Sequence, residues 1–358
     1  MNARAERLRQ LLADAGAEAY FSFSPPANEY LAGFRGTTSA VLITVDTQFF
    51  FCDFRYAEQA DAMVSGYAIE VCNSGLEKFV GERLHDLGIQ HAAFDPGVLT
   101  VEQQATVAAQ ATATELVSAP GLLAGLRQHK DPEEIAKLRA ANDLAEGVLA
   151  DLLPELREGI EEREFAARME YEFKRRGAQG SSFAPIVLFG SRSSLPHGVP
   201  GGKPLERGDV VLLDFGCILG SYCSDLTRTY AFGTIPGAWF EEIYAVTLQA
   251  QLAALELVCP GTPCAAADAA ARDIIAAAGF GDYFGHGLGH GVGLEVHEGP
   301  RLNRLSQATL EPGMVVTVEP GIYLPGQGGV RIEDLVVVTE TGCDILSKTP
   351  KELKVLNA

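Results

Sequence analysis

The segment FGHGLGHGVGLEVHE, residues 284–298, places three of the chain's seven histidines among five glycines. His286 and His290 are four residues apart and would share one face of a helix, but each glycine costs a helix about 1 kcal/mol relative to alanine. The segment is therefore predicted to be a loop or an extended strand. Glycines allow backbone or ligand to approach closely, and imidazole is a common metal ligand and proton carrier near neutral pH. The alternative interpretation is a glycine-rich surface turn with incidental histidines.

The whole chain has 358 residues, which is long enough to predict two domains. Of these residues 47% are apolar. The net charge is −19 and no run of Lys or Arg stands out, which argues against nucleic acid or an anionic membrane as partner. No apolar stretch approaches the roughly 18 residues of a membrane helix, and the N-terminus lacks the apolar core of a signal peptide. We therefore expect a soluble, cytoplasmic protein without a membrane partner.

Seven cysteines are scattered along the chain, and none forms a C-x-x-C pair. An odd number without such spacing favours reduced thiols over disulfides or a thiolate zinc site, which agrees with a cytoplasmic setting.

The chain changes character near the segment APGLLAGLRQHKDPEE. Residues 1–126 alternate helical and strand patterns without a glycine-rich phosphate loop, which predicts an α/β domain. Asp131 suits a helix N-cap and Pro132 the first helical position, so a new helix begins there. Residues 127–358 mix helices and strands without regular βαβ alternation, which predicts a second domain of the α+β class.

Two pairs of acidic residues in this second domain flank turn-like segments. Asp214 ends an apolar strand, and a hairpin about Leu219 and Gly220 would place Asp225 directly opposite it. Directly opposed residues have β-carbons about 4.5–5.5 Å apart, and two buried carboxylates that close repel each other unless a cation lies between them or one is protonated.

The second pair repeats this arrangement, because Glu319 and Glu333 are each seven residues from Gly326 in LPGQGG. Four carboxylates and one imidazole could then converge, which suits two divalent ions such as manganese, cobalt or iron better than thiolate-bound zinc. Taken singly, each acid could equally belong to a solvated turn or a salt bridge.

Five segments in combination resemble the pita-bread metallopeptidases, in the proline-specific branch of Xaa-Pro aminopeptidases and prolidases: PHGVP, DFG with the later SDLTRT, GHGLGHGVGLEVHE, GMVVTVEPGIY and GGVRIEDL. ANEYLAGFRGTTSAVLITV and FCDFRYAEQA look like the creatinase-type N-terminal domain that accompanies this branch. The resemblance covers nearly the whole chain. It implies an α/β N-terminal domain followed by an α+β pita-bread catalytic domain of the creatinase/aminopeptidase type.

The resemblance also implies a ligand set for two divalent metal ions. Asp214 would bind one ion, Asp225 and Glu333 would bridge both, and His290 and Glu319 would complete the shell of the second. Manganese is expected first, with cobalt, iron or zinc as alternatives.

Catalytic roles follow from the same resemblance. Glu319 would accept and shuttle the proton of the attacking water, and His197, His286 and His297 would line the pocket and assist at the oxyanion. Arg331 would orient the aspartate that it contacts.

The implied activity is hydrolysis of the bond between an N-terminal residue and proline, in dipeptides or short peptides. Arg301 matches an arginine with which prolidases of this branch bind the free carboxylate of a dipeptide, but it could equally be an ordinary surface arginine. Two alternatives stay open: a metal-free, creatinase-like amidinohydrolase, and a catalytically silent peptide-binding protein of the same fold. The resemblance further implies a homodimer.

Overall fold

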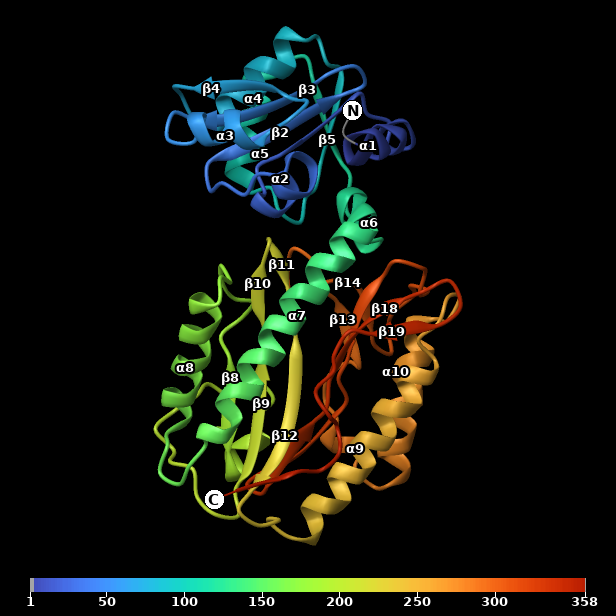
Figure 1. Cartoon of the computed structure of the whole chain (residues 1–358). Helices are drawn as coiled ribbons and strands as arrows, with labels where there is room; N and C mark the ends of the chain where they lie inside the picture. The colour runs from blue at the N-terminus through green and yellow to red at the C-terminus, as the bar shows by residue number, and fades with distance from the viewer. Residues whose placement is uncertain (1–2, 358) are drawn as a thin grey trace. The chain divides into compact units, whose positions relative to one another are not determined.

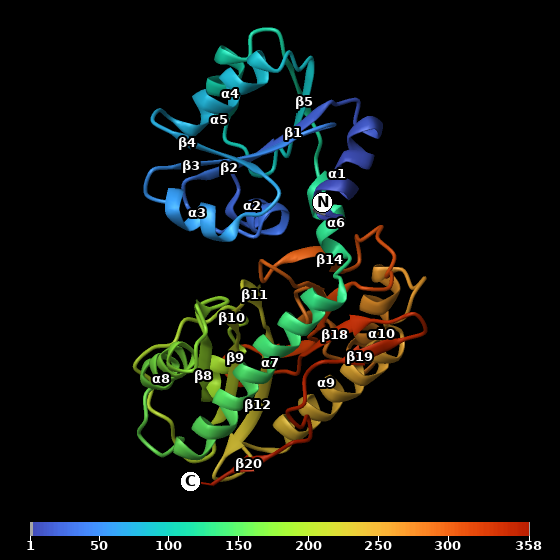
Figure 2. The same cartoon turned by 45° about the horizontal axis from the view of Figure 1, so that its top comes forward.

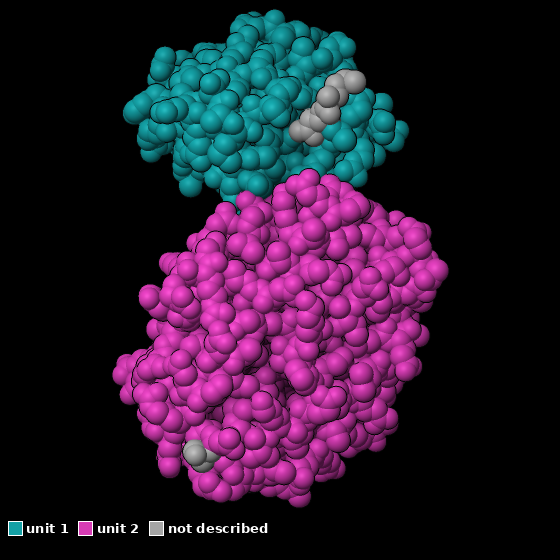
Figure 3. Space-filling view, viewed as in Figure 1, with its two compact units in different colours: residues 1–127 teal, residues 128–358 magenta. Residues whose placement is uncertain are grey.

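The computed structural model describes residues 3–357, and its chain divides into two compact units after Arg127. Figure 3 colours the two units separately. No helix within residues 3–357 combines the length and the apolar character needed to cross a membrane.

The first unit is a six-stranded mixed sheet with the strand order β4-β3-β2-β1-β5-β6. The neighbours β1, β2 and β3 run antiparallel, whereas β3–β4, β1–β5 and β5–β6 are parallel pairs. Its strands are β1 (Ala19–Ser22), β2 (Ser39–Thr44), β3 (Gln48–Asp53), β4 (Ala68–Cys72), β5 (His91–Phe94) and β6 (Glu115–Ser118). Its helices are α1 (Ala3–Asp14), α2 (Pro25–Ala32), α3 (Ala57–Met63), α4 (Leu76–Asp86) and α5 (Val101–Gln110), and α6 (Leu122–Gln128) follows.

Every residue of the central strands β1 and β2 is buried, as expected where a sheet is covered on both faces. Phe21, Leu42 and Phe51 from the sheet pack with Val80 and Leu84 of α4 in one hydrophobic cluster. The unit is thus an α/β sandwich with its own core, which confirms the predicted class of the N-terminal part.

The second unit begins with the helix that the sequence predicted. Asp131 accepts a hydrogen bond from the backbone N–H of Glu134 at 2.9 Å, and the Glu134 side chain accepts one from the backbone of Asp131, which is a capping box. The helices of this unit are α7 (Pro132–Leu152), α8 (Glu162–Arg175), α9 (Ala238–Glu256) and α10 (Cys264–Ala277). Figures 1 and 2 both show α9 and α10 side by side.

Two curved sheets carry the functional side chains of the second unit. The first has the order β20-β12-β9-β8, and the second has the order β14-β13-β15-β18-β19. The first contains β8 (Ile186–Phe189), β9 (Val210–Phe215), β12 (Leu226–Phe232) and β20 (Val355–Leu356). The second contains β13 (Gly289–Gly291), β14 (Glu298–Leu302), β15 (Val315–Val318), β18 (Asp334–Val338) and β19 (Cys343–Ile345). Smaller pieces are the hairpin β16 (Gly321–Leu324) and β17 (Gly328–Arg331), and the strands β7 (Gly180–Ser181), β10 (Cys217–Leu219) and β11 (Tyr222–Cys223).

Each sheet of this unit has its own layer of helices. Leu149 of α7 and Phe165 of α8 pack in one hydrophobic cluster with Leu213 of β9, whereas Ala250 of α9 joins another cluster with Val316 of β15. The mixture of helices and strands without regular alternation confirms the predicted α+β catalytic domain.

The two predicted hairpins have different outcomes. The register about Gly326 is confirmed, since Val318 pairs with Asp334 and Gly321 with Arg331, so that Glu319 and Glu333 stand opposite each other between these pairs. The chain leaves β17 and enters β18 at Ile332 and Glu333.

The predicted pairing of Asp214 with Asp225 is wrong. Asp214 pairs with Thr227, because the turn lies at Gly220 and Ser221 rather than at Leu219 and Gly220. Both turn residues have positive φ, 56° and 71°, as a two-residue type I′ hairpin turn requires. The turn therefore moves by one residue and the partner of Asp214 by two, and Asp225 reaches the neighbourhood of Asp214 from just before β12.

Candidate active site

Three buried carboxylates come together where the two sheets of the second unit meet. Asp214 stands near the end of β9, Asp225 directly precedes β12, and Glu333 lies between β17 and β18. One carboxylate oxygen from each lies within 4.8 Å of the others. The structure thus brings together three of the predicted metal ligands despite the shifted hairpin.

Asp214 and Glu333 each have one carboxylate oxygen that accepts a hydrogen bond from a side chain and, within residues 3–357, one that does not. Arg331 Nη2 donates to Asp214 Oδ2 at 2.5 Å, and Thr227 Oγ1 donates to Glu333 Oε2 at 2.7 Å. Asp214 Oδ1 and Glu333 Oε1 are buried without a hydrogen-bond partner among the described residues. An unmatched buried polar atom costs about 1–3 kcal/mol, so two such oxygens facing one cluster fit the binding of a cation.

The cluster is electrostatically unfavourable when the protein is considered alone. Burial raises the pKa of Asp214, although Arg331 opposes this. Burial and the charges of Glu333 and Asp214 hold the pKa of Asp225 well above its ordinary range, and burial together with Glu319 does the same to Glu333. Divalent cations remove such repulsion, and carboxylate oxygens are the ligands that hard cations prefer.

A histidine and a fourth carboxylate extend the cluster on one side. His290 Nε2 lies 3.2 Å from Glu319 Oε1 and 3.6 Å from Asp225 Oδ2. Burial acts to raise the pKa of Glu319, but the hydrogen bond and charge of His290 outweigh it and lower that pKa to about 2. Thr317 Oγ1 donates to Glu319 and accepts from the backbone N–H of His290, which ties the two residues to β15.

Two glycines of residues 284–298 are required by close packing of the backbone beside this cluster. A β-carbon on Gly289 would lie 2.1 Å from the Thr317 carbonyl oxygen, and one on Gly291 would lie 2.0 Å from the Gly299 carbonyl oxygen. Side chains there would separate β13 from its neighbouring strands and move His290. The predicted extended strand is confirmed for Gly289–Gly291, and the rest of the segment is largely loop.

A cavity of about 550 Å³ opens above the cluster, and all the predicted site residues except Glu333 line it. Glu333 is only 1% exposed and lies below its floor. The predicted residues in the lining are His197, Asp214, Asp225, His286, His290, His297, Arg301, Glu319 and Arg331. The sequence therefore identified a set of side chains that does converge on one cavity.

The outer histidines are held in different ways. The rings of His290 and His297 meet edge to face with centroids 4.4 Å apart. His286 Nε2 lies 2.9 Å from the Tyr323 hydroxyl, and its Nδ1 lies 2.8 Å from the Gly287 carbonyl oxygen. Burial lowers the pKa of both His286 and His297, so both are mainly neutral at pH 7 and can each donate one N–H.

Three residues that support the site were not predicted from the sequence. Tyr323 accepts a hydrogen bond from Arg331 Nη1 at 2.7 Å besides its contact with His286. Thr227 and Thr317 hold Glu333 and Glu319. The only available signal was period-two spacing in a strand, which places Thr227 two residues after Asp225 and Thr317 two before Glu319.

Comparison with known sequences and structures agrees with this geometry. Residues 136–340 match the family described as Metallopeptidase family M24, and residues 4–129 match the Creatinase/Prolidase N-terminal domain. A Bacillus subtilis protein named "Uncharacterized peptidase YqhT" is 42% identical over 351 residues, which cover 98% of this chain and 99% of the relative.

Two solved structures extend the likeness over the whole chain. The Xaa-Pro dipeptidase from Bacillus anthracis has a TM-score of 0.95 at 42% identity, covering 99% of each chain. The X-Pro aminopeptidase from Thermotoga maritima has a TM-score of 0.90 at 34% identity, covering 98% of this chain and 99% of the other. With its buried carboxylate cluster and this full-length similarity, the chain belongs to metallopeptidase family M24.

Proposed function

We propose that this protein is a dinuclear-metal peptidase that hydrolyses the bond between an N-terminal residue and proline in dipeptides or short peptides. The observation that carries the proposal is the cluster of Asp214, Asp225 and Glu333, with two unmatched oxygens, at the base of a peptide-sized cavity. The printed names of the similar structures, an Xaa-Pro dipeptidase and an X-Pro aminopeptidase, support the substrate class.

Five residues would hold the two ions: Asp214, Asp225, His290, Glu319 and Glu333. The chemistry that divalent ions supply when bound is polarisation of a carbonyl and a lowering of the pKa of water to roughly 7. Because the donors are four carboxylates and one imidazole, we propose manganese as the native metal, with cobalt, iron or zinc as alternatives.

Glu319 is the proton carrier in this proposal. Its carboxylate lines the cavity beside the other proposed ligands, so it can accept a proton from the attacking water. It then returns the proton to the proline nitrogen as the peptide bond breaks. Thr317 keeps the carboxylate oriented while the proton moves.

The outer residues stabilise the reacting carbonyl and align the ligands. His197, His286 and His297 line the cavity. His197 and His297 would donate hydrogen bonds to the developing oxyanion, whereas both ring nitrogens of His286 are engaged, by the Gly287 carbonyl and the Tyr323 hydroxyl. Arg331 holds Asp214 at 2.5 Å and keeps its remaining oxygen directed into the cluster.

Arg301 would decide between a dipeptidase and an aminopeptidase. It lines the same cavity as the three histidines and its backbone pairs with His290. A guanidinium there could bind the free C-terminal carboxylate of an Xaa-Pro dipeptide in bidentate fashion. A longer peptide has no carboxylate at that position, so the same residue would disfavour it.

The test is release of free amino acid from Gly-Pro, Ala-Pro and Ala-Pro-Ala by metal-stripped protein, with and without added Mn²⁺ or Co²⁺. Metal-restored cleavage of the dipeptides alone establishes a dipeptidase, and cleavage of Ala-Pro-Ala establishes an aminopeptidase. Arg301→Ala should reduce cleavage of the dipeptides more than cleavage of the tripeptide. An equal reduction for both would refute the proposed binding of the C-terminal carboxylate by Arg301. Absence of cleavage with any metal would support the alternative of a catalytically silent peptide-binding protein. Hydrolysis of creatine without metal would support the alternative of a creatinase-like amidinohydrolase.

We further propose that residues 1–126 and 127–358 act as the two functional domains, and that the protein works as a homodimer in the cytoplasm. No disulfide joins any of the seven cysteines within residues 3–357, which suits a reducing compartment. Sedimentation equilibrium of the purified chain would test the dimer.

A further inference from the structure

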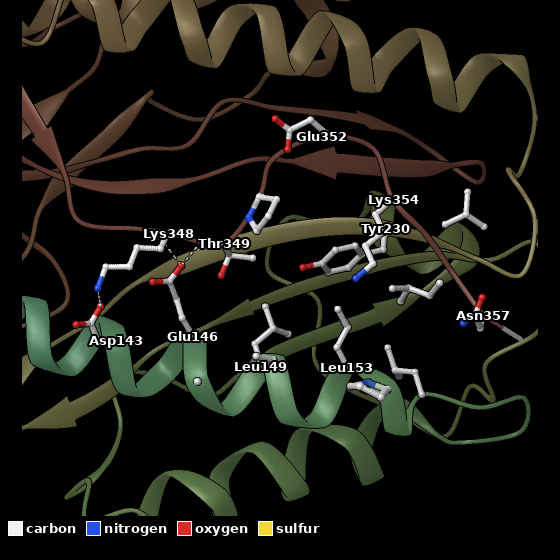
Figure 4. A pocket seen from close by; sticks show the side chains of 17 residues that line it. Asp143, Glu146, Leu149, Leu153, Tyr230, Lys348, Thr349, Glu352, Lys354 and Asn357 are labelled. Carbon is white, nitrogen blue, oxygen red and sulfur yellow. Dashed lines mark hydrogen bonds and ion pairs between the residues drawn. The ribbon is translucent and has the colours of Figure 1, made fainter.

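A second cavity, of about 750 Å³, lies between α7 and the C-terminal segment that ends in β20. Figure 4 shows its lining, with Leu149 on α7 and Leu153 directly after α7 facing Thr349 and Lys354 of the C-terminal segment. It shares no lining residue with the cavity above the carboxylate cluster. Its volume is in the range of small-molecule binding sites, roughly 300–1,000 Å³.

The walls of this α7 cavity are mainly apolar. Eight of its lining residues have aliphatic side chains or proline rings: Leu149, Ala150, Leu153, Pro154, Leu156, Pro350, Val355 and Leu356. The Tyr230 side chain also forms part of the wall, and its buried hydroxyl has no hydrogen-bond partner among residues 3–357. The cavity therefore offers an apolar surface for a ligand to cover and one hydroxyl group that a ligand could hydrogen-bond.

Most charged groups around the α7 cavity are already satisfied. Glu146 Oε1 accepts hydrogen bonds from the backbone N–H groups of Lys348 at 2.7 Å and Thr349 at 2.5 Å. The Lys348 ammonium lies 2.5 Å from Asp143 Oδ1. One end of the cavity is thus closed by neutralised charges, as the dashed lines of Figure 4 show.

Two exposed charged groups of the lining, Glu352 and Lys354, form no ion pair within residues 3–357. Figure 4 shows the Lys354 side chain directed toward Tyr230, whereas the Glu352 side chain points away from Tyr230. A cation without a counter-ion beside an apolar wall is complementary to a molecule with an apolar body and one anionic group.

We propose that the α7 cavity binds an amphipathic monocarboxylate, whose hydrocarbon part lies along the apolar wall and whose carboxylate pairs with Lys354. This inference does not depend on the peptidase activity, since the site is separate from the carboxylate cluster.

Three ten-carbon probes that differ only in the head group test the proposal: decanoate, 1-decanol and decylammonium. Their dissociation constants for the full-length protein are measured by ligand-observed NMR. We expect decanoate to bind about two- to fivefold more tightly than 1-decanol, as one partly exposed ion pair allows. Decylammonium should bind most weakly of the three.

Two variants locate the binding. Ala150→Trp, on the exposed α7 position that lines the cavity, should abolish decanoate binding by filling the space. Ala140→Trp, at an exposed α7 position outside the lining, is the matched control and should leave decanoate binding unchanged. Lys354→Met should remove the preference for decanoate over 1-decanol. Circular dichroism spectra like that of the wild type establish that each variant is folded.

The proposal is overturned if decanoate does not bind, if Ala150→Trp binds it as the control does, or if decylammonium binds more tightly than decanoate at a site that Ala150→Trp blocks. A Lys354→Met variant that keeps the full preference for decanoate would equally refute the assigned ion pair.

Discussion

Asp225 is stable as a buried anion only when a cation neutralises its neighbours. Its pKa in the fold is raised by burial, Glu333 and Asp214, above an unfolded value of about 4. In metal-free protein its ionisation therefore destabilises the fold at pH values above about 4, and the penalty grows as the pH rises through the folded pKa.

Asp225→Asn should consequently stabilise the metal-free protein at pH 7.5, by about 1–3 kcal/mol in the free energy of unfolding. The gain should shrink at pH 4.5. Excess Mn²⁺ should reverse the order, because the wild type gains about 4.1 kcal/mol when the metal is at about 1,000 times its Kd. Urea unfolding in EDTA and in Mn²⁺ at both pH values is the measurement. A variant less stable than the wild type in EDTA at pH 7.5 would count against the repulsion.

Tyr323 connects two groups of the active site through one hydroxyl, since it accepts from Arg331 and contacts His286. Tyr323→Phe should lower kcat for Ala-Pro about 5- to 50-fold, because each lost hydrogen bond is worth about 0.5–1.5 kcal/mol. KM should change little, since the hydroxyl positions protein groups rather than binding substrate. Tyr283→Phe, at an exposed position, is the control; the same loss in both variants would exclude a specific role.

For single residues, the proposed metal ligands could be predicted from the sequence, but the residues that hydrogen-bond to them could not. Asp214 stood out because a carboxylate within an apolar strand demands a partner, and His290 because glycines surround it. Thr227 and Thr317 are ordinary strand residues by composition. Their importance depends on which carboxylate lies within reach, and that is a property of tertiary packing.

Among the elements, β13 is the one most dependent on glycine. Gly289→Ala would press a methyl group into the Thr317 carbonyl oxygen of β15, so we expect a loss of about 2–3 kcal/mol in the free energy of unfolding. Gly285→Ala has no atom within 4 Å of the new β-carbon and should stay within about 0.5 kcal/mol of the wild type. Denaturant unfolding in EDTA separates this packing effect from metal binding; equal losses would show that packing against β15 is not the cause.

The two hairpins show what a sequence can and cannot say about register. LPGQGG centres its turn on Gly326, and the strands on either side pair as predicted. ILGS instead allows a turn at either of two adjacent positions, and nothing in the sequence shows that Ser221 adopts φ 71°. The choice is made by the pairing of β9 with β12 in the sheet.

At the scale of the whole molecule, each unit has a hydrophobic core of its own. Calorimetry of the metal-free protein should therefore show two unfolding transitions. Mn²⁺ should raise the Tm of only one of them, and Asp225→Asn should remove that response, which assigns the transition to residues 128–358. A single transition that moves as a whole with metal would contradict independent cores.

The overall architecture was predictable because motifs spread over the chain agreed with one another. Residues 284–298, the two acidic pairs and the N-terminal patterns pointed to the same fold, although single elements were misplaced. The cavity beside α7 had no such signal. Its walls are aliphatic residues from α7, from the residues directly after α7 and from the C-terminal segment, and only the folded chain brings those distant segments together.

The symmetry of the β16–β17 hairpin has a consequence for how the protein can be altered. Glu319 and Glu333 are opposed through the pairing of the strands, and the turn at residues 325–327 is exposed and serves only to join them. Residues inserted at Gly326 would lengthen the loop without changing which side chains face each other. This tip is therefore a natural place for a reporter peptide or an affinity tag, and a point where descendants of the chain could diverge in length while Glu319 and Glu333 stay opposed.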